Sequence, residues 1–170
     1  MMAATSKAIQ SLPALNRPDG TAMSPDSLPG KLLGKRVALY FAAGWCPMCT
    51  SFEPSLMAFI EKSKSISGGI GDIEVIYVPS DKSVDDIVRR TLAMGMMSVP
   101  FGENADAIKS QYKIWAGIES SRLGSDRRSG VPSLVVLDSI DGNELAFLPT
   151  ESMGAKALQL WPLEDTNGVW

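Results

Sequence analysis

Apolar runs too short for isolated helices divide the chain and predict the strands of a sheet. The run Arg36–Ala43 is apolar after its first residue, which is typical of a strand covered on both faces of an α/β sheet. Ile73–Pro79 and Ser133–Asp138 predict two further strands. Asp141–Asn143 has the composition of a tight turn, so Glu144–Leu148 is expected to return as an antiparallel strand beside the third.

Apolar residues at helical spacing predict helices between and after these strands. Ser83 stands three residues before Asp86, which is the pattern of a side-chain cap at a helix N-terminus. Pro54 falls inside the longest helical pattern and is expected to kink that helix. Helices are expected over residues 46–65, 84–92, 105–112 and 155–161. The order of strands and helices predicts a mixed sheet with helices on both faces.

The chain divides into an arm, one domain and a short tail. Proline, glycine and serine gather in residues 1–30, where we expect short turns and one small strand near Thr21–Met23. Residues 31–165 have the length of one domain of ordinary size, and residues 166–170 form the tail. Within the domain, Ser67–Asp72 predicts a glycine-rich turn, and Trp115–Ser129 predicts a solvated surface loop.

The composition excludes several classes of function. The 170 residues carry a net charge of −3, which argues against a strongly basic protein that coats nucleic acid. The chain contains no histidine, so Ser-His and Cys-His nucleophilic catalysis and histidine-ligated metal sites are excluded. Its two cysteines are too few for a structural zinc site within one chain.

The expected location of the protein is the cytoplasm. No apolar run approaches the ~20 residues of a membrane-spanning helix, and residues 1–16 lack the apolar core of a secretory signal. Lys7 and Arg17 precede the first acidic residue, Asp19, so a weak organelle-targeting peptide is the alternative. In the reducing interior of a cell, two cysteines are more often catalytic or redox-sensing than a permanent disulfide.

Cys46 and Cys49 stand three residues apart where a helix is expected to begin. In the first turn of a helix this spacing places the two Cα atoms about 5–6 Å apart, which a disulfide can span. Free N–H groups and the helix dipole stabilise a thiolate on Cys46, whereas Cys49 lies one turn further in and is expected to be more buried, with the higher pKa. We therefore expect Cys46 to be the attacking nucleophile and Cys49 the resolving thiol.

The neighbours of the two cysteines favour a redox pair over a metal site. Pro47 suits the first position of a helix, where its missing N–H costs no hydrogen bond, and Trp45 provides a flat apolar rim beside the attacking sulfur. No other cysteine or histidine is present to complete a metal site, which would have to be shared between two copies of the chain. The candidate substrate-binding residues of this motif are Trp45, Pro47 and Met48.

Several segments resemble the tryparedoxins and nucleoredoxin-like proteins, a branch of the thioredoxin superfamily. Val37–Cys49 resembles their active-site strand and turn, and Gly130–Asp138 resembles their cis-proline loop with the strand that follows. Further likenesses are found at Ser80–Ser83, Ser98–Phe101 and Leu160–Pro162. The resemblance covers about residues 31–163. It implies a thioredoxin-like α/β fold, with a central mixed sheet flanked by helices on both faces and with Trp115–Ser129 as an insertion.

The resemblance also implies further site residues. In this superfamily the backbone before the cis-proline pairs with the bound substrate, which would place Val131 and Pro132 at the substrate groove. Tyr40 stands where thioredoxins bury an aspartate that accepts the proton of the resolving thiol, so Cys49 would pass its proton to water or to another carboxylate. Glu53 is close in sequence but is expected to face solvent. The dipeptide between the cysteines is Pro47-Met48, whereas these families usually have Pro-Pro. This difference is expected to affect the redox potential and not the type of reaction.

The predicted function is thiol–disulfide exchange. The Cys46 thiolate would attack a protein disulfide, and Cys49 would then resolve the mixed disulfide and release the reduced protein. The alternative implied by the resemblance is a redox-sensitive protein-binding module of the nucleoredoxin type, with a signalling or regulatory role. We expect a monomer that needs no metal or organic cofactor and binds neither nucleic acid nor a membrane. Its electron donor would be a reductase, a small dithiol or glutathione.

Overall fold

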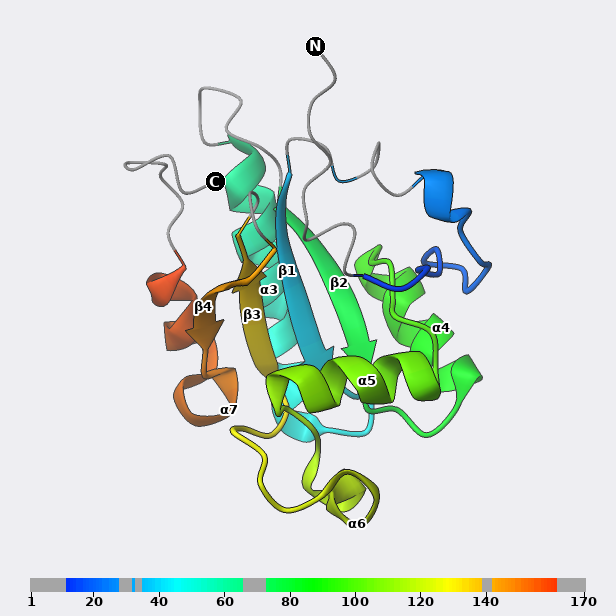
Figure 1. The fold of residues 1–170 in the computed structure, drawn as a ribbon. Coiled ribbons are helices and arrows are strands. Elements are labelled where there is room, and N and C mark those ends of the chain that lie inside the picture. The colour runs from blue at the N-terminus through cyan, green and yellow to red at the C-terminus, as the bar shows by residue number, and fades with distance from the viewer. Residues whose placement is uncertain (1–11, 28–31, 33–34, 66–72, 139–141, 162–170) are drawn as a thin grey trace.

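A four-stranded sheet runs through the part of the chain that the structure describes, with the strand order β2-β1-β3-β4 (Figure 1). The structure is a computed structural model, and it describes residues 12–27, 32, 35–65, 73–138 and 142–161. β1 pairs parallel with β2 and antiparallel with β3, and β3 pairs antiparallel with β4, which confirms the predicted mixed sheet. The strands are β1 Arg36–Ala42, β2 Ile73–Pro79, β3 Ser133–Leu137 and β4 Glu144–Leu148.

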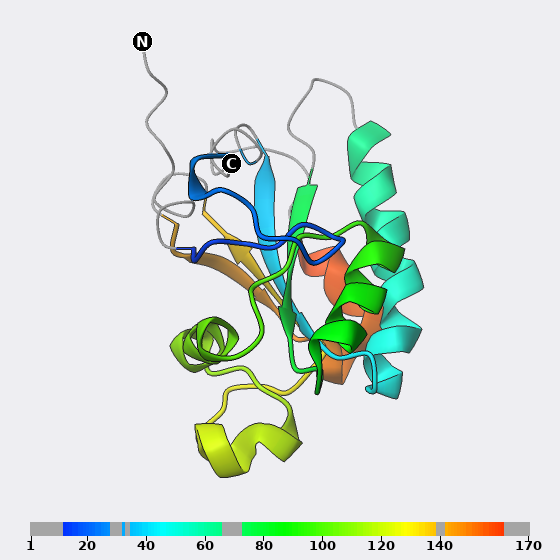
Figure 2. The same cartoon turned by 90° about the vertical axis from the view of Figure 1, so that its right-hand side faces the viewer.

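Helices cover both faces of the sheet, as the order of elements predicts. α3 and α4 lie on one side of the sheet and α5 on the other (Figure 2). The helices are η1 Pro25–Ser27, α3 Pro47–Ser65, α4 Val84–Met94, α5 Glu103–Tyr112, η2 Gly117–Glu119, α6 Ser120–Leu123, α7 Thr150–Met153 and η3 Gly154–Leu160, where η marks a 3-10 helix. Within the described ranges, no helix is long and apolar enough to cross a lipid bilayer.

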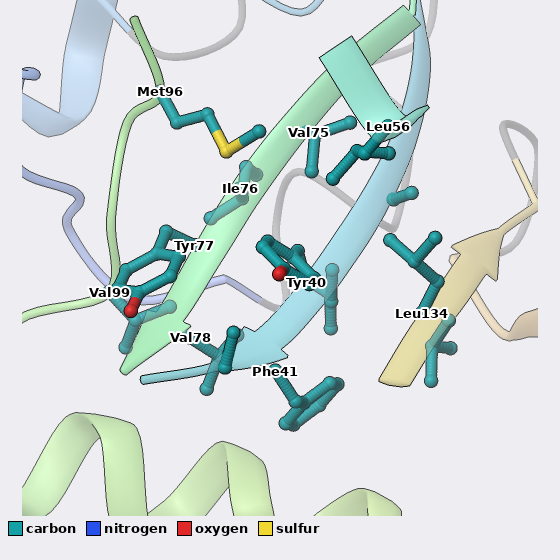
Figure 3. Close-up of a cluster of buried hydrophobic side chains, with 14 of the residues drawn as sticks. Tyr40, Phe41, Leu56, Val75, Ile76, Tyr77, Val78, Met96, Val99 and Leu134 are labelled. Carbon is teal, nitrogen blue, oxygen red and sulfur yellow. The ribbon is translucent and has the colours of Figure 1, made fainter. Parts of the chain in front are cut away.

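β1 is a central strand, and all of its residues are buried. Neighbouring residues on a strand point to opposite faces of the sheet. The Tyr40 ring centre accordingly lies 6.0 Å from that of Phe52 on α3, and the Phe41 ring centre lies 6.1 Å from that of Tyr112 on α5. Tyr40 also faces its register partner Tyr77 on β2 (Figure 3). This packing on both faces explains why the sequence of β1 is apolar after its first residue. It also fixes the C-terminal end of β1 in the centre of the fold.

Two local predictions need correction. The last predicted helix is instead a 3-10 helix, η3, which follows the short helix α7. Gly154 lies at their junction with a φ of 60°, in the left-handed region that glycine adopts without a steric penalty. Near Thr21–Met23 the described residues form only an isolated bridge between Asn16 and Ala22 instead of a strand. The predicted turn Ser67–Asp72 lies outside the described residues, as does the first residue of the turn before β4.

The segment Trp115–Ser129 is only in part the solvated loop that its glycine and serine content predicts, because residues 124–128 are exposed whereas Trp115, Ala116 and Glu119 are buried. It contains η2 and α6 and lies at the end of the sheet where β1 and β2 finish (Figures 1 and 2). Trp115 is buried, and its indole N–H donates a 3.2 Å hydrogen bond to the Gly124 carbonyl. Glu119 is also buried, and its carboxylate accepts a 2.6 Å hydrogen bond from the Lys109 ammonium. The buried ring and the buried ion pair hold this segment against α5.

Candidate active site

The turn between β1 and α3 carries both cysteines. β1 ends at Ala42 and α3 begins at Pro47, so Cys46 immediately precedes the helix and Cys49 lies in its first turn. Cys46 keeps 6% of its surface exposed, whereas Cys49 is fully buried. The predicted position of the helix start is confirmed within one residue. The order of exposure is the one expected of an attacking and a resolving thiol.

Gly44 allows this turn to approach its neighbours closely. The Gly44 N–H donates a 2.8 Å hydrogen bond to the Asp81 carboxylate, which also accepts a 2.6 Å hydrogen bond from the Tyr77 hydroxyl. A side chain at position 44 would place its Cβ 2.9 Å from Cδ of Arg90, so a larger residue would force Arg90 to move. These contacts fix the turn against the end of β2 and against α4.

The two sulfur atoms are in direct contact. Cys49 Sγ lies 2.6 Å from Cys46 Sγ, and both cysteines are free thiols. The Cys49 backbone N–H donates to the Cys46 sulfur over 3.2 Å, which stabilises negative charge on that sulfur. Burial raises the pKa of the Cys49 thiol, and its hydrogen bond to Cys46 raises this pKa further. Cys49 therefore retains its proton near neutral pH.

The loop before β3 faces the cysteines, as the resemblance implies. The peptide bond between Val131 and Pro132 is cis, and the Val131 carbonyl oxygen lies 3.9 Å from Cys46 Sγ. The Ser133 hydroxyl donates a 2.7 Å hydrogen bond to the Gly130 carbonyl and so closes the loop. Val131 and Pro132 are both buried. The fold thus brings together Val131 and Cys46, which are 85 positions apart in sequence.

Three exposed side chains flank the cysteines, namely Trp45, Pro47 and Met48. The Trp45 indole N–H donates a 2.9 Å hydrogen bond to the Ser80 carbonyl. The Lys82 ammonium stands 5.9 Å from the centre of the indole ring, which is within range of a cation–π contact. The indole is therefore held in one position although it remains open to solvent. This fixed apolar surface beside Cys46 is suited to contact with a protein substrate.

A buried carboxylate lies close to Cys49, at a position that was expected to face solvent. Glu53 is 4% exposed, accepts a 2.9 Å hydrogen bond from the Tyr40 hydroxyl and forms an ion pair with Arg90. The Tyr40 hydroxyl also stands 3.4 Å from the Cys49 carbonyl oxygen. The expectation is wrong because residues four apart share one face of a helix. Glu53 therefore follows Cys49 onto the inward face of α3.

Burial sets the protonation of the groups around the cysteines. It raises the pKa of Tyr40 and of Tyr77, so both phenols are neutral and can donate hydrogen bonds. Burial also raises the pKa of Asp81, although the hydrogen bonds from the Tyr77 hydroxyl and the Gly44 N–H act in the opposite direction. In the ranges that the structure describes, no group of three or more His, Cys, Asp or Glu side chains is placed to hold a metal ion.

Sequence reasoning missed two acidic residues near this site, Asp81 and Glu119. Asp81 stands two residues after the end of the buried strand β2. In α/β sheets polar side chains at the carboxyl ends of strands often form sites, so a signal for Asp81 was available. Glu119 gives no such signal, because Ser80, the partner that connects it to the site, lies 39 positions away in sequence. Its carboxylate accepts hydrogen bonds from the hydroxyl of Ser80 and the ammonium of Lys109. Through Ser80, the segment Trp115–Ser129 is connected to Trp45.

The chain is similar in sequence and in fold to known thioredoxin-like proteins. A family profile described as Thioredoxin-like matches residues 34–144. The Arabidopsis thaliana protein named "Probable nucleoredoxin 1" is 30% identical over 152 residues, which cover 87% of this chain and 22% of that protein. Tryparedoxin from Trypanosoma brucei brucei is 29% identical over 123 residues, which cover 72% of this chain and 72% of that protein. A tryparedoxin II solved in complex with glutathionylspermidine superposes with a TM-score of 0.64 at 20% identity, over 97% of this chain and 100% of that one.

These similarities cover unequal shares of the proteins compared. The chain spans only 22% of the length of the Arabidopsis nucleoredoxin but 72% of the length of the tryparedoxin. The matched region of this chain contains both cysteines and the loop with Val131 and Pro132. It is the region in which the geometry of the candidate site was found.

Proposed function

We propose a protein-disulfide reductase activity for this chain, which belongs to the thioredoxin-like family and is related to nucleoredoxins and tryparedoxins. It is a thioredoxin-like oxidoreductase with the CxxC pair Cys46–Cys49, and thioredoxin-like proteins act on disulfide substrates. One observation carries the proposal. The Cys46 sulfur lies 2.6 Å from the Cys49 sulfur and 3.9 Å from the Val131 carbonyl oxygen. It can therefore react with a bound disulfide and then with Cys49.

In the first step of the proposed reaction, the Cys46 thiolate attacks one sulfur of the substrate disulfide. A bond forms between that sulfur and Cys46, the substrate S–S bond breaks, and the second substrate sulfur leaves as a thiolate that takes a proton from water. The Cys49 N–H, 3.2 Å from the Cys46 sulfur, stabilises the attacking thiolate. Trp45, Pro47 and Met48 would contact the substrate polypeptide beside it.

In the second step, the Cys49 thiol loses its proton to water and its sulfur attacks the Cys46 sulfur of the mixed disulfide. A bond forms between the two cysteines, the bond between Cys46 and the substrate sulfur breaks, and that sulfur leaves as a thiolate that takes a proton from water. The substrate is thereby released as a dithiol, reduced by two electrons, and the Cys46–Cys49 pair is oxidised to a disulfide. Because burial raises the pKa of Cys49, this thiol stays protonated until the mixed disulfide has formed. The neutral Tyr40 hydroxyl and the Glu53 carboxylate support the first turn of α3 while Cys49 reacts.

Val131 and Pro132 are proposed to bind the substrate backbone. Their loop faces Cys46, so an extended substrate segment that pairs with it would carry its disulfide to the attacking sulfur. The oxidised pair would be reduced again by a thiol donor, which can be a reductase, a small dithiol or glutathione. One solved tryparedoxin II is bound to glutathionylspermidine, which supports a low-molecular-weight thiol as the first donor to test. The proposed setting is a cytoplasmic monomer, with residues 31–165 as its catalytic domain.

The activity is tested by turnover of the full chain on an insulin-type disulfide substrate with each donor class in turn. We expect reduction that depends on the donor and is abolished in Cys46→Ser. A second function has some support, because the chain is 30% identical to the Arabidopsis protein named "Probable nucleoredoxin 1". This second function is a redox-sensitive protein-binding module of the nucleoredoxin type, with a signalling or regulatory role. Turnover with any donor favours the enzyme. Binding of a partner in only one redox state, without turnover, favours the module.

A further inference from the structure

We propose that a groove beside Trp45 binds a segment of the substrate protein that carries a large apolar side chain next to an acidic residue. This groove has a volume of about 440 Å³, within the usual range of roughly 300–1,000 Å³ for ligand pockets. One wall comes from the start of α5, and the other from the insertion Trp115–Ser129. The proposal rests on the proposed reductase function, because it assigns a specificity to the same site.

The floor of the groove is preorganised by buried polar groups. Glu119 is buried and accepts hydrogen bonds from the Ser80 hydroxyl, the Lys109 ammonium and the Ala116 N–H. Lys109 is itself buried. A buried charge pair whose hydrogen bonds are satisfied on several sides holds its surroundings in one arrangement. The groove therefore exists before any partner binds, and binding does not have to order it.

Two large apolar side chains line this groove and are open to solvent. Phe101, just before α5, is 50% exposed, and Ile118, in η2, is 58% exposed. Side chains of this size normally gain by leaving water, at roughly 25 cal/mol for each Å² of apolar surface that becomes buried. They come from two different elements and border one cavity, so a single apolar side chain that enters the groove can cover both.

The acidic side chains that line the groove, Asp81, Asp106 and Glu119, are all held by hydrogen bonds within the protein, so one cation stays available for an acidic neighbour of that apolar side chain. Arg122 is already paired with Asp106, at 2.9 Å, and with Glu119. In the described part of the chain, Lys82 has no ion pair with an acidic side chain, and its ammonium lies over the exposed Trp45 ring. A carboxylate next to the apolar side chain would meet this cation at the rim.

The groove lies close enough to the attacking cysteine for the substrate protein to be its ligand. Ser80 lines the groove, and its carbonyl accepts the hydrogen bond of the Trp45 indole, which flanks the attacking Cys46. A polypeptide whose disulfide reaches Cys46 can therefore continue over Trp45 into the groove. Small disulfides cannot reach it, so the groove would raise the rate for some protein disulfides and leave small ones unaffected.

The test compares the full-length chain with variants on disulfide-bonded peptides. One peptide series carries Leu-Asp at successive positions after the reactive cysteine, a second series carries Ser-Asn there, and bis(2-hydroxyethyl) disulfide is the small reference. The measured quantity is the second-order rate constant for each peptide divided by that for the reference. In Ile118→Ser and in Phe101→Ser this ratio should fall about tenfold for the best Leu-Asp peptide and stay constant for the Ser-Asn peptides. Lys82→Gln should cause a smaller loss, about threefold at low salt, that disappears at high salt.

A matched control is available on α4. Leu92 is 58% exposed, the same fraction as Ile118, and it does not line the groove. Leu92→Ser should leave the ratio unchanged, while circular dichroism confirms that every variant is folded. Equal ratios in the wild type, Ile118→Ser and Phe101→Ser would overturn the proposal.

A binding measurement separates this proposal from the proposed function. The best Leu-Asp peptide is made with serine in place of cysteine, and its affinity is measured by calorimetry for the wild type and for Ile118→Ser. Weaker binding to Ile118→Ser supports the groove even if the chain reduces no disulfide, an outcome that would reject the reductase function alone. Equal binding rejects the groove alone. A wild-type dimer in sedimentation that Ile118→Ser converts to monomers would show that a second copy covers the groove, and would also overturn the proposal.

Discussion

The hydroxyl of Tyr40 donates a 2.9 Å hydrogen bond to the buried carboxylate of Glu53. Tyr40 lies on β1 and Glu53 on α3, so this hydrogen bond joins the sheet to the helix that carries Cys49. The ion pair of Glu53 with Arg90 extends the connection to α4. Tyr40, Glu53 and Arg90 thus form a polar network inside an otherwise apolar core, and this network holds the start of α3 against the sheet and α4.

Removing the charge of Glu53 should destabilise the fold. In Glu53→Gln we expect the free energy of unfolding to fall by about 2 kcal/mol, because Arg90 is left without its counter-charge in a partly buried place. Tyr40→Phe should cost about 1–2 kcal/mol, because a buried carboxylate oxygen loses its donor. Both values are measured by urea denaturation. Lys156→Gln, at an exposed position of η3, is the control and should change stability by less than about 0.5 kcal/mol. A loss no larger in Glu53→Gln than in this control would contradict the network.

The two cysteines should differ in what they trap. In Cys49→Ser a substrate should remain attached to Cys46 as a mixed disulfide, because no thiol is left to resolve it. In Cys46→Ser no adduct should accumulate, because Cys49 is fully buried. Mass spectrometry of each variant after incubation with a protein disulfide measures the adducts. Equal amounts in the two variants would show that the assignment of the attacking thiol is wrong.

The segment Trp115–Ser129 should contribute to stability. Glu119→Ala should lower the free energy of unfolding by about 3 kcal/mol, because Lys109 is left buried without its partner at 2.6 Å. Arg122→Ala removes a mostly exposed partner of the same carboxylate and should cost less than about 1 kcal/mol. Urea denaturation of the two variants measures these changes in the free energy of unfolding. A large loss in Glu119→Ala alone would show that the segment is packed, whereas equally small losses in both variants would show that it is a solvated loop.

The strands were predictable from the sequence because their signal is local. Ile73–Pro79 was predicted with the bounds that the structure has, since its residues are apolar except for Glu74, as expected of a strand buried on both faces. The cap of α4 by Ser83 was predictable for a similar reason, because the side chain and the N–H that it accepts from are three residues apart. The position of Cys46 at a helix start follows from Pro47 and the apolar spacing after it.

The burial of charged residues was not predictable in the same way. Glu53 and Glu119 look like solvent-facing positions, because an isolated carboxylate is costly to bury. Each is buried beside a partner that the sequence does not mark: Arg90 follows Glu53 by 37 positions, and Ser80 precedes Glu119 by 39. Such pairs are set by the tertiary fold. The groove beside Trp45 depends on one of them, so it could not be found before the structure.

The free energy of unfolding should contain a contribution from Asp81 that decreases as the pH rises. Burial raises the pKa of Asp81 above the ordinary 3.8, so in the interval between 3.8 and the folded-state pKa the native protein keeps a proton that the unfolded chain releases. The contribution of this group is therefore fully present below pH 3.8 and is lost as the pH rises through the folded-state pKa. Urea denaturation of the wild type and of Asp81→Asn across this range measures it, because the other titrating groups cancel in the difference. We expect the stability of the wild type relative to Asp81→Asn to fall with rising pH and then to level off. A difference that rises with pH would mean that the hydrogen bonds from Tyr77 and Gly44 outweigh the burial of the carboxylate.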